Sequence, residues 1–250
     1  MGGAMLRGWI AGGVLANSFT IVDPYVESLP EGVTLHRSAS EVSGKFDVML
    51  LGIKPQMVRE LAGPILSLLA ADATVISILA GTEANTLAGH FPGRTILRLM
   101  PNLAAAIGES PLAFFGADAQ QREAIANWFA PLGTTVWIES EDQMNAVTAL
   151  AGSGPAFVYR FIDALAVAGA ETGLPADIAA QLAMSTVKGA ALLAADADES
   201  PAKLAARVTS PGGTTATGLA ILDDKDALNR LIEDTLRAAR DRGAELAKGS

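Results

Sequence analysis

Short β-branched runs alternate with amphipathic runs in this 250-residue chain from Thr20 to about Ile138. That alternation is typical of a parallel sheet covered by helices. Strands are predicted at residues 20–23, 33–37, 47–53, 74–79, 95–100, 112–115 and 134–138. A helix is predicted over 55–70, and Pro64 should kink or split it. The expected fold class is α/β, with a doubly wound parallel sheet.

The pattern changes at Ser140, which forms a capping-box candidate with Gln143. Everything afterwards reads as helical, with long helices predicted over 156–172, 175–195 and 224–248. We therefore expect two domains, a sheet domain at 1–139 and an all-α domain at 140–250. A helical domain of about 110 residues cannot easily bury so much aliphatic surface alone, so it is expected to dimerise.

Composition argues against several classes of function. Half of the residues are hydrophobic, yet no run of 18 or more is continuously apolar, and the first residues lack a signal-peptide pattern. We expect a cytoplasmic protein with no membrane span. There is no cysteine, and His36 and His90 lie far apart, so no metal site is predicted. The net charge is -9 without a Lys/Arg cluster, which argues against nucleic acid as a partner.

The run from Thr209 to Thr215, Thr-Ser-Pro-Gly-Gly-Thr-Thr, lies between two helical segments. Gly212 and Gly213 let the backbone turn with exposed amides, and the following helix adds partial positive charge in its first turn. Thr214 and Thr215 add hydroxyl groups at the same place. This pattern favours a carboxylate or phosphate, although an ordinary glycine turn with threonine caps has the same residues.

A doubly wound sheet binds its ligand at the carboxyl ends of its strands. Asp23 ends the first predicted strand, where an acidic side chain would accept hydrogen bonds from ribose hydroxyls and favour NAD over NADP. An aspartate before Pro24 is equally typical of a turn. The segment Met1–Met5, which contains Gly2, resembles the end of the G-x-G-x-M-G dinucleotide fingerprint of Rossmann-like domains. The fingerprint's two leading glycines and its preceding strand are missing. Either the natural protein has further residues ahead of Met1, or this chain is an impaired homologue.

Taken together and in order, the motifs resemble those of the pyrroline-5-carboxylate reductases over nearly the whole chain. The resemblance rests on the strand-end segments, the Ala-Gly-Ser-Gly-Pro-Ala run at 151–156 and the Ser-Pro-Gly-Gly-Thr-Thr run at 210–215. The resemblance assigns cofactor contacts to residues that follow the strands: Gly2, Asp23, Gly52, Ile53, Lys54, Pro55, Leu79, Ala80, Met100, Pro101 and Asn102. This chain departs from the resemblance at Ala39, where relatives often have an asparagine that contacts the cofactor.

The resemblance also implies a reaction: hydride transfer from NADPH or NADH to C5 of 1-pyrroline-5-carboxylate, a small cyclic imine, which gives L-proline. Gly212 and the amides of Gly213, Thr214 and Thr215 would hold the substrate carboxylate. The Thr215 hydroxyl would hydrogen-bond the ring nitrogen as the catalytic proton donor or relay, and Glu141 matches a position near the substrate. In relatives, interlocked homodimers often assemble into homodecamers.

Two alternatives stay open at this point. A β-hydroxyacid-type dehydrogenase should carry a catalytic lysine in its helical domain, with an asparagine one turn later. Lys188 is the only lysine well inside the predicted helices, and no asparagine follows it at that spacing. An inactive oligomeric or regulatory homologue is the other alternative, because the dinucleotide fingerprint is incomplete.

Overall fold

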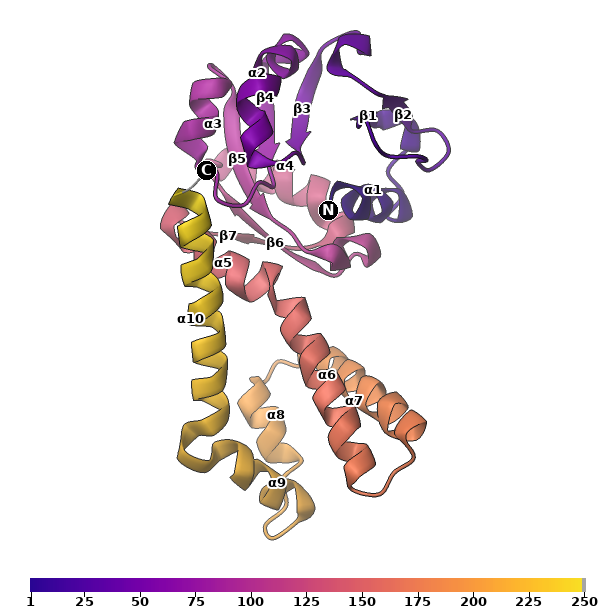
Figure 1. Cartoon of the computed structure of the whole chain (residues 1–250), viewed down its shortest axis with the longest axis vertical. Coiled ribbons are helices and arrows are strands. Elements are labelled where there is room, and N and C mark those ends of the chain that lie inside the picture. Colours follow the sequence, from indigo (N-terminus) through magenta and orange to yellow (C-terminus); the bar gives the residue numbers. More distant parts are fainter. Residues whose placement is uncertain (249–250) are drawn as a thin grey trace. The chain divides into compact units, whose positions relative to one another are not determined.

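The computed structural model describes residues 1–248. Two sheets are present in this part of the chain (Figure 1). Their strands are β1 Thr20–Val22, β2 Thr34–His36, β3 Phe46–Leu51, β4 Leu69–Ser77, β5 Thr95–Met100, β6 Ser110–Phe115 and β7 Gly133–Trp137. Strand β1 pairs with β2 in parallel, and the larger sheet has the order β3-β4-β5-β6-β7. All the predicted strands are present, and β4 begins earlier than expected.

The larger sheet is parallel except between β5 and β6, which run antiparallel. The wholly parallel sheet expected from the sequence is therefore wrong at this pair. Residues 101–109 connect the two strands and contain only the short helix η4 (Leu103–Ile107). A parallel crossover needs a dozen or more residues, usually with an α-helix, so this connection is too short for one.

The helices are α1 Gly2–Ala11, α2 Val58–Ser67, α3 Ala84–His90, α4 Ala119–Phe129, α5 Met144–Val147, α6 Gly154–Glu171, α7 Ala176–Asp196, α8 Pro201–Arg207, α9 Thr214–Asp223 and α10 Ala227–Lys248. Helix α2 is shorter than predicted and contains Pro64 without being split by it. The predicted capping box at Ser140 and Gln143 is present, at the start of the short helix η6 (Glu141–Gln143).

The larger sheet is sandwiched between helices, because alternate residues of each strand point to opposite faces. In β4, Ile76 packs with Trp9 of α1 and Phe129 of α4, whereas its neighbour Val75 packs on the other face with Leu87 of α3. All five side chains are at most 4% exposed. Two hydrophobic layers therefore hold the sheet rigidly, and its strand ends are firmly placed.

The chain forms two compact units, one of residues 1–152 with 239–250 and the other of residues 153–238. The boundary predicted at 139/140 falls inside the first unit. Residues 141–152 continue the helical pattern of the sequence, but Met144 of α5 packs into a buried cluster with Met100 of β5 and Ala113 of β6. This segment therefore belongs to the sheet unit by its packing.

In the second unit, α6 and α7 pack closely where a Cβ added to Gly169 would lie 3.3 Å from the Ala179 Cβ. Most of the apolar side chains of these helices remain exposed, among them Phe161, Leu182 and Leu193. Helix α7 is the one described helix long and apolar enough to cross a membrane, and only 11% of its most apolar window is buried. Exposed apolar helix faces of this size also mark surfaces that bind another protein chain.

Candidate active site

Three of the predicted cofactor segments follow neighbouring parallel strands. Residues 52–55 follow β3, residues 79–81 come just after β4, and residues 100–102 lie at the end of β5. Because β3, β4 and β5 are adjacent and parallel, their carboxyl ends meet at one edge of the sheet. The structure thus brings these three segments to a common edge, where a doubly wound sheet binds its ligand.

Helix α1 begins at Gly2, the residue matched to the end of the dinucleotide fingerprint. Its first turn has no acidic residue, and a Cβ added at Gly2 would meet no atom within 4 Å. The first amides of a helix have no intrahelical partner and favour anions. This helix start therefore fits a pyrophosphate group.

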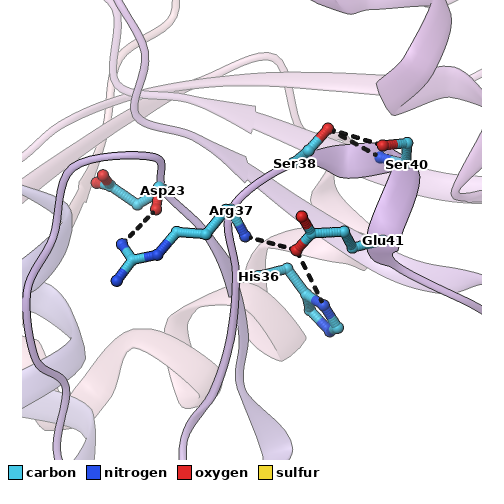
Figure 2. A network of polar contacts seen from close by, with 6 residues as sticks. All are labelled: Asp23, His36, Arg37, Ser38, Ser40 and Glu41. Atoms are coloured by element: carbon cyan, nitrogen blue, oxygen red, sulfur yellow. Dashed lines mark hydrogen bonds and ion pairs between the residues drawn. The ribbon is translucent and has the colours of Figure 1, made fainter.

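Asp23 lies directly after β1, in a polar network with residues that follow β2 (Figure 2). Its Oδ1 accepts hydrogen bonds from the amides of Tyr25 (2.7 Å) and Val26 (2.9 Å). Arg37 Nη1 donates to the Asp23 carbonyl oxygen at 3.1 Å and to that of Val26. The turn after β1 is thus held from both sides, and Asp23 Oδ2 has no hydrogen-bond partner among residues 1–248.

The same network continues along the chain after β2. The Arg37 amide donates to Glu41 Oε2 at 2.9 Å, and the hydroxyls of Ser38 and Ser40 are 2.9 Å apart (Figure 2). Ser38 and Ser40 flank Ala39 in the chain. Sequence reasoning did not single out Arg37 as part of this site, because a lone exposed arginine carries no motif.

Asn102 ties the end of β5 to the segment that leads into α6. Its side-chain amide donates to the Ala151 carbonyl oxygen at 3.0 Å, and its Oδ1 accepts from the Ala104 amide at 2.9 Å. Its backbone amide donates to the Ser110 hydroxyl, also at 2.9 Å. Residue 102 is therefore rigidly held next to the predicted nicotinamide position.

Glu141, the predicted substrate residue, has its carboxylate engaged within the sheet unit. Its Oε1 accepts hydrogen bonds from Arg98 Nη1 at 2.8 Å and from the Ala84 amide at 2.7 Å. The Arg98 side chain is only 7% exposed. Sequence reasoning missed Arg98 as a partner, although a charged residue inside an otherwise apolar strand was a usable signal.

The predicted anion loop lies in the second unit, where Gly213 is the N-cap of α9. Gly212 has a φ of +70°, which glycine adopts without steric cost, and a Cβ at Gly213 would lie 2.5 Å from Ser210 Oγ. The Gly213 amide donates to the Ser210 carbonyl oxygen within the turn. The amides of Thr214 and Thr215 lie in the first turn of α9, where backbone amides have no intrahelical partner, so they remain available for an anion.

The two groups of candidate residues thus fall in different compact units. The strand-end segments, α1 and Glu141 lie in the sheet unit, and the loop at 209–215 lies in the helical unit. Within the loop, the positive φ of Gly212 favours glycine at that position.

A family model described as pyrroline-5-carboxylate reductase dimerisation matches residues 141–246. The pyrroline-5-carboxylate reductase of Synechocystis sp. is 39% identical over 214 residues, which are 83% of this chain and 78% of that protein. The matched helical region is therefore the one through which the family dimerises, and it contains the apolar faces of α6 and α7.

Solved structures agree along nearly the full length. A pyrroline-5-carboxylate reductase from Coxiella burnetii has a TM-score of 0.89 at 28% identity, covering 97% of this chain and 93% of that one. A Plasmodium falciparum pyrroline carboxylate reductase, solved with NADP bound, has the same fold, with a TM-score of 0.83 at 24% identity over 99% of this chain and 94% of that one. Because a relative with 39% identity is matched over 78% of its length, this chain belongs to the pyrroline-5-carboxylate reductase family.

Proposed function

We propose that this chain reduces 1-pyrroline-5-carboxylate to L-proline with NADH or NADPH, the last step of proline biosynthesis. The observation that carries the proposal is the alignment of three predicted cofactor segments along one edge of the sheet, in a chain of this family. The Plasmodium relative was solved with NADP, which supports a nicotinamide cofactor for this chain too. When bound, the nicotinamide supplies the hydride.

The chain's own residues would bind and orient the reactants. The start of α1 at Gly2 would hold the pyrophosphate, and Asp23 Oδ2 would accept from a ribose hydroxyl, which favours NADH. Residues 52–55 and 79–80 would line the cofactor, with residues 100–102 beside the ring. Fixing the imine carbon in one orientation is itself a large part of such catalysis.

On the substrate side, the amides of Thr214 and Thr215 would hold the carboxylate. The Thr215 hydroxyl would hydrogen-bond the ring nitrogen. Because a hydroxyl alone is a weak acid, it would either relay a proton from water to that nitrogen or only hydrogen-bond an imine that is already protonated when it binds. The helical region would form the family's dimer, with decamers as the proposed higher assembly and the cytoplasm as the proposed location.

No strand pairing joins β1 to β3 within residues 1–248, so each has a free edge. We infer that a further parallel strand, not supplied by these residues, fits between them and places the glycine turn ahead of α1. A chain extended before Met1 by an Ile/Val-rich strand ending in Gly-x-Gly should show slower amide hydrogen exchange in β1 and β3. Unchanged exchange there would contradict the added strand.

The activity is tested by following oxidation of NADH and of NADPH with pyrroline-5-carboxylate, for the chain that starts at Met1 and for the extended chain. The variant Thr215→Ala should lower kcat roughly 100-fold, the usual effect of losing a proton relay. Thr235→Ala is the matched control, because that hydroxyl only donates to the Leu231 carbonyl oxygen in α10. A folded, dimeric extended chain without imine-dependent oxidation would show the inactive homologue instead.

A further inference from the structure

Arg98 is the charged residue of β5, a strand that is otherwise apolar from Ile96 to Met100. The residue is only 6% exposed. Charged side chains are almost never buried to this degree unless they are paired. Its partner is Glu141, which lies 43 positions further along the chain, with 2.8 Å between Arg98 Nη1 and Glu141 Oε1.

The same Glu141 oxygen holds a third segment. It accepts a hydrogen bond from the Ala84 amide at 2.7 Å, and Ala84 is the first residue of α3. One carboxylate oxygen therefore joins the end of the loop after β4, the middle of β5 and the start of the segment that leads to the helical unit. We call this arrangement of Arg98, Glu141 and the Ala84 amide the clasp.

Two of the three segments joined by the clasp run into residues assigned to the cofactor. The loop that ends at Ala84 begins with Leu79 and Ala80, and Arg98 lies two residues before Met100. Bonds that fix both segments to Glu141 therefore also fix their separation.

Few other polar bonds hold the loop after β4. The Leu79 amide donates to Ser77 Oγ at 3.2 Å at its beginning. Thr82 Oγ1 and Arg98 Nε are buried and have no hydrogen-bond partner within residues 1–248. A loop with an unpaired buried hydroxyl depends strongly on the bonds that it does make, and the bond from Ala84 to Glu141 is at its far end.

We propose that Arg98 and Glu141 are positioning residues for the nicotinamide cofactor, and that Glu141 acts through the clasp and not by touching the substrate. This inference rests on the proposed function. It predicts that weakening the clasp changes the affinity for the dinucleotide and leaves the affinity for the imine unchanged.

The main test compares KM values for NADH and for pyrroline-5-carboxylate in Glu141→Ala and Glu141→Gln. The alanine variant should raise KM for NADH about tenfold or more, since a hydrogen bond to a charged group is lost at each partner. Glutamine keeps an acceptor for both donors and should restore most of the affinity. The control is Glu139→Ala. Glu139 lies two residues before Glu141, and this variant removes only its exposed ion pair with Arg122.

A second variant removes only one bond, in case Glu141→Ala fails to fold with Arg98 left unpaired. Ala84→Pro deletes the amide donor at the first helical position, where proline is well tolerated. Glu83 already has a φ of -74° and a ψ of 152°, the conformation that a following proline requires. This variant should raise KM for NADH while the ion pair between Arg98 and Glu141 stays intact.

A rise in KM for the imine alone would overturn the proposal, since Glu141 would then be contacting the substrate. The proposal would also be overturned if the Glu141 variants had the same KM values as the unmodified chain and only a smaller fraction of active protein. That result would indicate a purely structural role. Titrating NADH binding by fluorescence keeps the test separate from the proposed reaction. If the unmodified chain binds NADH without reducing the imine, the proposed function fails while the clasp is still tested by the dissociation constants.

Discussion

At the scale of single residues, the exposed pair between Arg122 and Glu139 shows how one hydrogen-bonded arginine changes a carboxyl group. Arg122 Nη1 and Nη2 donate to the two Glu139 oxygens at 2.9 and 3.3 Å, and the guanidinium lies 5.3 Å from the Trp137 ring. The pKa of Glu139 is lowered, first by the hydrogen bond from Arg122 and then by its charge. The same hydrogen bond raises the pKa of Arg122.

The variant Arg122→Leu should therefore raise the pKa of Glu139 towards its ordinary value, as measured by an NMR pH titration. The folded state binds this proton less tightly than the unfolded state does. The pair thus stabilises the fold above the unfolded carboxyl pKa of about 4.3, and this contribution disappears as the pH falls through the lowered value. An equal rise in the pKa of Glu139 in the control Arg59→Leu would refute this assignment.

At the scale of elements, the packing of α1 on η4 depends on Gly8. A Cβ at this residue would lie 1.9 Å from the Ala105 carbonyl oxygen, so Gly8→Ala must move the helix. We expect a loss of about 3 kcal/mol in the free energy of unfolding, the usual cost of overpacking. The matched control is Gly89→Ala in α3, where a Cβ meets no atom within 4 Å. It should be neutral or stabilise by up to about 1 kcal/mol.

Denaturant unfolding of both glycine variants measures this difference. A Gly8→Ala protein as stable as the Gly89→Ala protein would show that α1 does not pack tightly against η4 in solution. The comparison also bears on the cofactor, because α1 carries Gly2 at its start. If the helix shifts, binding of NADH should weaken together with stability.

At the scale of the whole molecule, the exposed apolar faces of the helical unit should be covered by a second copy. Leu193 is 73% exposed and lies in α7, inside the region matched to the family's dimerisation model. Replacing it by lysine introduces the charge on both copies of a symmetric interface. We expect Leu193→Lys to weaken the dimer by at least roughly 100-fold, since burying a leucine contributes about 1.5–3 kcal/mol on each side.

Light scattering over a range of protein concentrations measures the dimer. Leu15→Lys is the matched control, because Leu15 is 70% exposed but lies in the sheet unit, outside the dimerisation region. A dimer as tight in Leu193→Lys as in the control would place the contact surface elsewhere. For the unmodified chain, the melting temperature should rise with protein concentration, as association stabilises the folded state.

Sequence alone determined the type and order of most elements, because the period of the apolar residues, the turn glycines and the helix caps are local properties. It also determined which segments follow the strands, and hence Asp23 and residues 100–102 as site candidates. Tertiary structure decided what depends on distant partners. Strand β6 runs antiparallel to β5, β1 does not pair with β3, and residues 141–152 pack with the sheet. The pairing of Arg98 with Glu141 across 43 positions belongs to the same group. No local pattern encodes such contacts, since they depend on where the folded chain places each surface.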